Sequence, residues 1–424
     1  MIETVILLAM PFLTALALAT LRSEPLGASI DRWVTTLALP SAIALAAWGQ
    51  VLAGLGLLTA ILVWFIAALD RWSASPTSDE APSAVTRAMD QVLLGGLLLV
   101  ACAPAGIPLW GALAVTVVAA SGRPRPRRIA PETPVLPTAL LPPMGDDPAT
   151  PPPTPPPTPA PLGLPRDQGL VLRNPAILAA SMLLVLFGVL TAGLDPMLAG
   201  GCRIIGLAAI LVLVPALLPV SLLLLLRLAG PQASGLPPAD TLATMLLAAG
   251  VAGLLACSAL PLLRLLPAQR TMVLAQIALA AAAIGLGDGV FGAVILLVLL
   301  TLSDAAARVA PLSGPVGSNP GGPITLLALA GVPPFGTFAG LALVLPLMAQ
   351  RSPWLLLACL PGLALPAWPL IRQAAHRLRR HRPATPSSIT PSLAWLPLVL
   401  TLILGFLLPD SLTAALRAIV ATAP

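Results

Sequence analysis

The sequence predicts an all-α, polytopic integral membrane protein with about 11–13 transmembrane helices. Hydrophobic residues make up 58% of the 424 residues and charged residues only 9%, whereas a soluble domain carries about 25% charged residues. Apolar runs recur along the whole chain, and a helix of about 20 apolar residues crosses a bilayer. The runs are continuous rather than alternating, which excludes a membrane β-barrel.

The apolar runs place the expected helices in order along the chain. The first run follows Met1 closely, without a basic segment or a cleavage site, so we expect a membrane helix rather than a signal peptide. Residues 33–69 fit two short helices or one bent helix, and the runs at 89–104 and 106–121 are short for two full crossings. The expected spans are 4–21, 33–50, 51–69, 89–104, 106–121, 171–193, 200–226, 238–263, 269–287, 289–307, 322–349, 352–373 and 392–409.

One segment differs from the rest of the chain. Residues 122–170 contain 17 of the 50 prolines, among them the run from Pro151 to Pro159. Such a run cannot form a helix and is typical of polyproline II or disorder. The segment therefore predicts a linker between N-terminal transmembrane helices at 1–121 and C-terminal transmembrane helices at 171–424. A plain spacer is favoured over a ligand for a proline-binding domain.

The basic residues indicate topology rather than nucleic-acid binding. All 22 are arginines, and most lie in short connections between apolar runs. Such arginines favour the cytoplasmic side. Both the loop at 372–382 and the linker start at 123–128 carry several, yet the expected spans between them put the two on opposite sides. The arginines therefore do not decide on which side of the membrane the linker lies.

The cysteines and histidines predict no redox cofactor and no metal in this chain. Four cysteines lie singly in apolar runs with no CxxC motif, and the two histidines, His376 and His381, lie in an arginine-rich loop. Iron–sulfur, zinc and c-type haem signatures are therefore absent. Buried small hydrophobes are the expected role of the cysteines.

The most specific segment lies inside the span at 322–349. Pro333 and Pro334 remove two backbone donors, so the helix must break there. Gly336 and Gly340 permit an unwound backbone or the close approach of a neighbour. Broken helices at membrane depth occur where the freed backbone is buried in protein or lines a wet cavity. We therefore expect a broken helix at 331–340.

This segment resembles the A-G-x-P-P-x-x-G-F-x-x-K broken helix of the antiporter-like subunits of respiratory complex I, membrane-bound hydrogenases and Mrp-type cation/proton antiporters. A weaker resemblance, at 264–290, keeps the basic residue Arg270 and Gln276 of a helix that is more polar in the family. Leu341 stands where the family commonly has a lysine. The residues that match the main motif are Ala330, Gly331, Val332, Pro333, Pro334, Phe338 and Gly340.

The resemblance implies a membrane-arm subunit of a proton-translocating NADH–quinone oxidoreductase-like complex in the inner (plasma) membrane. Its partners would be the other membrane subunits and the lipid bilayer, and any enzymatic role would be that of a non-redox subunit. The family moves protons through lysines and a glutamate, but this chain has no lysine, and its four glutamates lie outside the deep parts of the expected spans. Its own pumping is therefore left open. The alternatives are a hydrogenase or Mrp-type subunit, a stand-alone small-molecule transporter, and a purely structural membrane protein.

Four polar residues are candidates for a proton path. Asp304 and Arg308, four residues apart on one span, form either a buried relay or, as favoured two to one, an ion pair at a helix end. Gln276 and Thr325 are uncharged and lie mid-span. Both would hold water in a proton path, and hydrogen bonding between helices is the equally good alternative.

Overall fold

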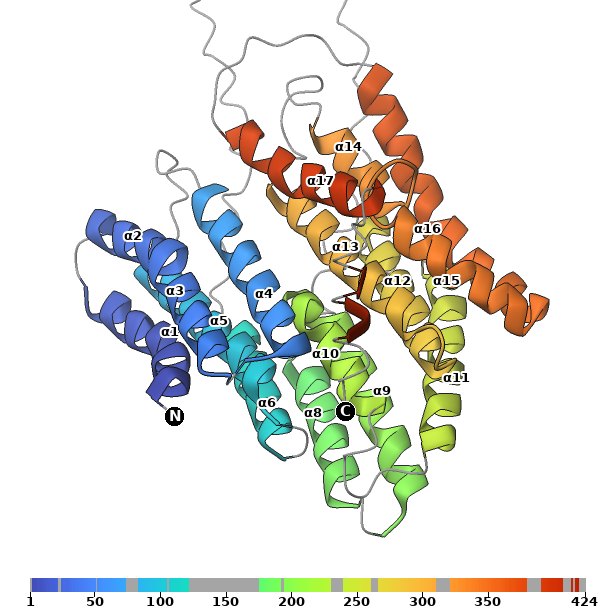
Figure 1. The fold of residues 1–424 in the computed structure, drawn as a ribbon, viewed down its shortest axis with the longest axis horizontal. Coiled ribbons are helices and arrows are strands. Elements are labelled where there is room, and N and C mark those ends of the chain that lie inside the picture. The colour runs from blue at the N-terminus through green and yellow to red at the C-terminus, as the bar shows by residue number, and fades with distance from the viewer. Residues whose placement is uncertain are drawn as a thin grey trace, which may run out of the picture.

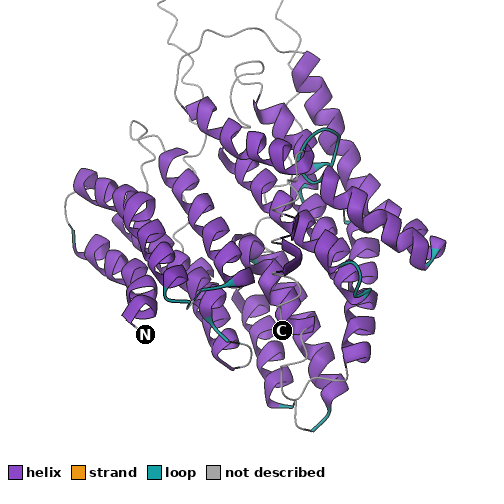
Figure 2. Cartoon of the chain, viewed as in Figure 1, coloured by secondary structure: helices purple, strands orange, loops and turns teal. Residues whose placement is uncertain are grey.

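A computed structural model of the chain describes residues 2–21, 24–50, 52–73, 83–104, 107–121, 175–191, 194–229, 239–260, 266–309, 321–379, 390–406, 413–414 and 416–418. Every regular element in these ranges is helical (Figure 2). The all-α class is thus confirmed. The expected linker at 122–170 lies outside the described residues.

The N-terminal helices form one packed group (Figure 1). The second expected span starts earlier than predicted, because α2, a π-helical stretch and α3 run on without interruption from residue 24 to residue 48. The group consists of α1 (Ile2–Thr20), α2 (Glu24–Trp33), the π-helix η1 (Val34–Ala38), α3 (Leu39–Trp48), α4 (Gly54–Ser73), α5 (Ala84–Cys102) and α6 (Ile107–Ser121).

The C-terminal helices include two interruptions. The expected break near residue 331 separates α14 from α15, and a second break separates α9 from α10. The elements are α8 (Pro175–Leu190), α9 (Pro196–Leu213), the 3₁₀ turn η2 (Pro215–Leu217), α10 (Leu218–Ala229), α11 (Ala239–Ala259), α12 (Ala268–Gly285), α13 (Val290–Val309), α14 (Gly321–Leu329), α15 (Phe338–Arg351), α16 (Pro353–Arg379) and α17 (Thr390–Phe406).

The prediction of one continuous span at 200–226 is wrong. Pro215 has no N–H and disfavours helical backbone at the residue before it. Val214 accordingly leaves the helical region, with φ −119° and ψ 83°. The apolar run continues through the break, so hydropathy alone did not reveal it.

The lengths of the helices fit a membrane protein. Eight of the described helices have the length and composition to cross a bilayer, and four shorter apolar helices accompany them. Large apolar side chains such as Trp48, Trp354 and Leu194 are exposed on the chain's outer surface, as expected where helices face lipid. The polytopic architecture is confirmed.

Capping side chains begin two of the described helices, α9 and α5. Asp195 precedes Pro196 and accepts hydrogen bonds from the backbone N–H groups of Met197 and Leu198 at 2.9 and 3.1 Å. Ser83 accepts one from the N–H of Thr86 at 3.2 Å. Both satisfy amides that a helix start leaves without a partner.

α10 joins the two groups of helices. It packs on α4 and α5 of the N-terminal group and on α11, α12 and α13 of the C-terminal group. Its Arg227 donates hydrogen bonds to the carbonyl of Val100, at 3.1 Å, and to that of Ala103. A guanidinium at the carbonyl end of α5 satisfies acceptors that the helix leaves open and complements its dipole.

Candidate functional site

The backbone leaves the helix between Leu329 and Phe338, which confirms the predicted break. The non-helical residues are 330–337, so the break ends earlier than the expected 340. Phe338 and Gly340 belong to the first turn of α15. The peptide bond between Pro333 and Pro334 is cis.

Glycines shape the break and the helix after it. Gly331 and Gly336 have φ values of +72° and +56°, a region that L side chains rarely adopt. A Cβ on Gly336 would lie 2.4 Å from the carbonyl oxygen of Ala328. Gly340 permits the close approach of a neighbouring helix, because a Cβ there would lie 2.4 Å from the Cα of Leu296 on α13. α15 therefore packs closely on α13 directly after the break.

Gln276 on α12 reaches the break. Its Nε2 donates a hydrogen bond of 2.7 Å to the carbonyl oxygen of Leu329, and the side chain is fully buried. In a continuous helix the N–H four residues later would fill this role, but that residue is Pro333. Gln276 thus replaces a donor that the proline removes.

Two further polar atoms lie buried at the break. The Oε1 of Gln276 and the Oγ of Ser303 have no hydrogen-bond partner among the described residues. Ser303 lies beside the unwound segment, since a Cβ on Gly336 would come within 2.9 Å of its Oγ. Thr337 donates a long hydrogen bond, of 3.4 Å, to the carbonyl of Ala328. The break therefore gathers hydroxyl and amide groups around the carbonyl end of α14.

Thr325, the other uncharged candidate, has a local role. Its Oγ1 donates a hydrogen bond of 2.7 Å to the carbonyl of Gly322 within α14. The structure therefore brings Gln276, but not Thr325, onto the freed backbone of the break.

Asp304 and Arg308 form the expected ion pair near the end of α13. The Nε of Arg308 donates to Oδ2 of Asp304 at 2.8 Å, and the exposed fractions of the two side chains are 33% for Arg308 and 14% for Asp304. Arg308 also lies within electrostatic reach of Asp70 on α4. Whether the pair takes part in a proton path stays a prediction.

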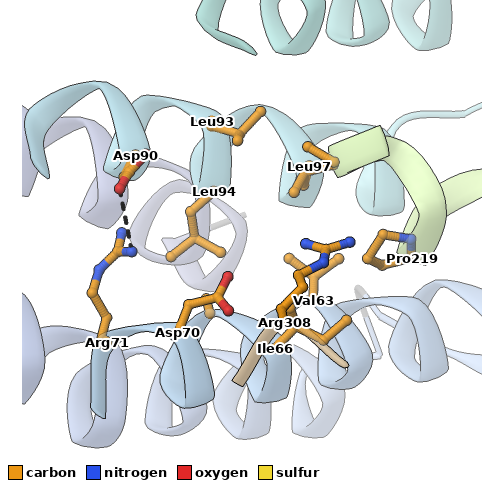
Figure 3. Close-up of a pocket in the computed structure, with 12 residues that line it drawn as sticks. Val63, Ile66, Asp70, Arg71, Asp90, Leu93, Leu94, Leu97, Pro219 and Arg308 are labelled. Atoms are coloured by element: carbon orange, nitrogen blue, oxygen red, sulfur yellow. Dashed lines mark ion pairs between the residues drawn. The ribbon is translucent and has the colours of Figure 1, made fainter. Parts of the chain in front are cut away.

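A charged cluster that the sequence analysis missed lies next to this pair. The guanidinium of Arg71 pairs with two carboxylates. Its Nη1 lies 3.5 Å from Oδ2 of Asp90 (Figure 3). Its Nε lies 2.7 Å from Oδ2 of Asp31. The Nε2 of Gln91 donates to Oδ1 of Asp31 at 2.6 Å and to Oγ1 of Thr35 at 3.0 Å. Asp31 and Gln91 are only 2% and 1% exposed. The cluster is a buried network across α2, η1, α4 and α5.

The apolar runs do not predict this cluster, because they are shorter than the helices. The expected spans end at residue 69 and begin at residues 33 and 89, so Asp31, Arg71 and Asp90 lie at or beyond span ends. The signal present was helical spacing: Arg87, Asp90 and Gln91 share one face of α5, as Asp31 and Thr35 share one face of their continuous helix.

A cavity of about 60 Å³ lies between the cluster and the ion pair. Such a volume holds a few water molecules. Its wall combines apolar residues with four charged ones, and Figure 3 shows Asp70 and Arg308 pointing into the space between α4 and α5. The lining residues come from α4, α5, α13 and the segment around the second helix break: Val63, Ile66, Ala67, Asp70, Arg71, Asp90, Leu93, Leu94, Leu97, Ala216, Pro219 and Arg308.

The described residues contain no group of three or more His, Cys, Asp or Glu side chains arranged to hold a metal ion. The four cysteines are free thiols, three of them buried. The absence of a resident cofactor stays a prediction.

The fold is that of a polytopic membrane protein. In the described part of the chain, two of its helices are interrupted, one at Pro215 and one at Pro333. No protein-family model and no curated protein matches the sequence. Solved structures do match, at sequence identities that show the fold alone.

Three matching chains come from respiratory membrane complexes. One is in the membrane-bound sulfane sulfur reductase, an archaeal respiratory membrane complex, with a TM-score of 0.60 and 15% identity over 98% of this chain and 96% of that chain. Another is in respiratory complex I from Thermus thermophilus with bound NADH, with a TM-score of 0.57 and 15% identity over 99% of this chain and 100% of that chain. A chain of the same complex with bound aureothin has a TM-score of 0.58 and 19% identity over 96% of this chain and 99% of that chain. The chain therefore has the fold of membrane subunits of complex I-like assemblies.

Proposed function

We propose that this chain is a membrane-arm subunit of a proton-translocating respiratory complex of the NADH–quinone oxidoreductase type. The observation that carries the proposal is the match over almost the full length of both chains with subunits of two respiratory membrane complexes. The chain would sit in the inner (plasma) membrane, bind neighbouring membrane subunits and lipid, and carry no redox centre itself. Electron transfer would take place in other subunits.

The two helix breaks support a role in moving ions. A break ends one helix inside the bilayer and exposes carbonyl groups that must be satisfied by protein or by water. Here Gln276 satisfies the carbonyl of Leu329 at one break, and Ala216, at the other, lines the charged cavity. Buried polar groups at membrane depth are costly and mark functional sites by default.

The alternatives differ in their partners. The same fold would suit a subunit of a membrane-bound hydrogenase, of an Mrp-type antiporter or of a sulfur-reducing complex like the one matched. A stand-alone transporter would need no partner at all.

Co-purification distinguishes these possibilities. We would express the tagged full chain at native level, solubilise membranes in mild detergent, and identify what co-purifies by mass spectrometry and by NADH–quinone activity. A tagged membrane protein of unrelated fold, purified in parallel, is the control for non-specific capture. We expect subunits that bear flavin and iron–sulfur clusters to co-purify with the chain, and the purified material to reduce quinone with NADH.

Other outcomes would revise the proposal. Recovery with a nickel–iron hydrogenase or with antiporter subunits would move the chain to that complex. A chain that purifies alone, from membranes in which its expression is native, would overturn the subunit proposal.

A further inference from the structure

The helices α8 and α9 carry a single charged residue between them, Arg203. The two helices lie side by side (Figure 1). α8 buries only a narrow stripe, formed by Ser181, Val185 and Gly188, and its other described side chains are half-buried or exposed. In a membrane protein, an apolar helix of this kind faces lipid over most of its surface.

Arg203 packs on this buried stripe. It is only 4% exposed, and its stem lies against α8, since a Cβ on Gly188 would come within 2.9 Å of its Cγ. Its Nε donates a hydrogen bond of 3.0 Å to the carbonyl oxygen of Gly188, which belongs to the last turn of α8 and has no partner within that helix. This bond uses one of the five N–H groups that a guanidinium offers.

The other four N–H groups, on Nη1 and Nη2, have no partner within the described residues. Arg203 makes no second hydrogen bond and no ion pair there. The side-chain atoms that are both enclosed and without a partner include neither of its Nη atoms, so these atoms lie at the protein surface. Neither α8 nor α9 carries an acidic residue, and Asp195, the nearest acid along the chain, caps the start of α9. The positive charge of Arg203 therefore has no counter-charge in this part of the chain.

The guanidinium lies close to one end of the two helices. Gly188 is two residues before Leu190, where α8 ends, which is about 3 Å at 1.5 Å per residue. Side chains of a helix lean towards its N-terminus. Arg203, about 10 Å into α9, thus directs its guanidinium back towards the connection between the two helices. Long basic side chains near helix ends reach the level of the lipid headgroups in this way.

The chemistry at this level fits a lipid phosphate. A guanidinium presents its N–H groups in a planar fork that matches the oxygens of a phosphate, and the hydrogen bonds between them are strengthened by charge. Large apolar side chains are exposed along the same two helices and their connection, among them Leu190, Leu194 and Ile205, and acyl chains can cover them. Since no carboxylate of the chain balances Arg203, a lipid with a net negative charge should bind better than a zwitterionic one.

We propose that Arg203 binds the phosphate of an anionic phospholipid, whose acyl chains lie along the exposed apolar surface of α8. The phosphate is the second partner of the guanidinium, beside the carbonyl of Gly188, and supplies the negative charge that the chain itself does not. The lipid thereby completes the packing of α8 on α9. This site goes beyond the function proposed above and does not depend on membership of a respiratory complex.

Lipid titration followed by native mass spectrometry tests the proposal. The delipidated full chain in mild detergent is titrated with phosphatidylglycerol and, separately, with phosphatidylcholine that has the same acyl chains. We expect the unmodified protein to bind one phosphatidylglycerol about tenfold more tightly than phosphatidylcholine, the factor that one good charge-assisted hydrogen bond provides. Arg203→Gln keeps an amide that can donate to the carbonyl of Gly188 but removes the charge, and it should abolish this preference.

Two further variants separate charge from packing. Arg351→Gln is the matched control, because Arg351 is an exposed arginine at the end of α15, and it should leave the preference unchanged. Arg203→Lys keeps the charge without the planar fork, and it should keep a preference for phosphatidylglycerol. Equal binding of the two lipids by the unmodified protein, or an undiminished preference in Arg203→Gln, would overturn the proposal.

A photoreactive lipid locates the site in the unmodified protein, and it gives the answer even if Arg203→Gln does not fold. Phosphatidylglycerol with a diazirine close to its headgroup should label the peptides that cover the end of α8 and the start of α9. No labelling of these peptides would refute the site.

Other occupants of the site give different results. Inorganic phosphate should not displace phosphatidylglycerol at equal concentration, and displacement would show an anion site that does not require a lipid. Loss of a co-purifying subunit from Arg203→Gln, with the lipid preference unchanged, would assign Arg203 to a carboxylate of that subunit. Either result would overturn the proposal, and neither bears on whether the chain belongs to a respiratory complex.

Discussion

At the scale of single residues, the helix break depends on a side chain from another helix. Gln276 supplies the donor that Pro333 lacks, and both partners are buried. We expect Gln276→Leu to destabilise the chain by about 1–3 kcal/mol, the usual effect of leaving a buried acceptor unsatisfied. The apparent unfolding temperature of the detergent-purified protein measures this. Thr325→Val is the control, because its hydroxyl bonds only within its own helical turn; an equal loss in both variants would contradict the assignment.

A second residue-scale prediction concerns Gly336. Its φ is +56°, and a Cβ there would press on the carbonyl oxygen of Ala328 at 2.4 Å. Gly336→Ala should therefore combine the cost of left-handed backbone, about 1–2 kcal/mol, with an overpacking cost of about 1–3 kcal/mol. Gly287 isolates the first contribution, because its φ is +77° and its Cβ would meet nothing within 4 Å. The unfolding temperature of Gly336→Ala should be well below that of Gly287→Ala. The reverse order would show that the backbone at the break rearranges easily.

At this scale the sequence predicts Gln276 and the helix break, but it does not predict the ion pairs between distant segments. Gln276 stood out because it is polar in an apolar run, and two adjacent prolines required a break. The partner of Asp31, by contrast, is Arg71, far along the chain and on another helix. Such a pairing depends on which helices become neighbours, and one sequence carries no record of that.

At the scale of elements, small residues let helices pack closely where no hydrophobic force brings them together in lipid. Gly250 of α11 is the clearest case, since a Cβ there would lie 2.5 Å from the backbone nitrogen of Ala282 on α12. Gly250→Ala should cost about 1–3 kcal/mol by forcing the two helices apart. Gly111 of α6 has open space around it, so Gly111→Ala should be neutral or stabilising by up to about 1 kcal/mol. Unfolding temperatures that do not separate these two variants would contradict the close packing of α11 on α12.

Element boundaries show what hydropathy can and cannot predict. The break at Pro333 was predicted because glycines and a second proline surround it. The break at Pro215 was not, because leucine and valine continue around Pro215 and Pro219, and prolines are common in transmembrane helices. The helices that contain Asp31 and Asp90 begin earlier than expected, because buried partners pair with the charges of these two residues. A charged residue marks the end of a span only where no other group inside the protein pairs with it.

At the scale of the whole molecule, the chain holds two groups of helices together through contacts and not only through their covalent connection. α10 packs on both groups, α4 packs on α13, and α6 packs on α8. Arg227 adds a charged donor to the carbonyl end of α5. A hydrogen bond that involves a charged group contributes about 1.5–3 kcal/mol, so this contact should matter once the chain is no longer continuous.

Cutting the chain tests this arrangement. A protease site introduced within 122–170 would allow the purified protein to be split into two parts, one that carries residues 1–121 and one that carries residues 171–424, with the folded helices in place. We expect the two parts to remain together through a second affinity step in mild detergent, because the interface between them survives the cut. Arg227→Ala should lower the detergent concentration at which they separate, since α5 then loses its charged cap. Arg351→Ala is the matched control, because Arg351 is exposed at the end of α15. Parts that separate at once without any substitution would show that the connection, rather than α10, holds the two groups together.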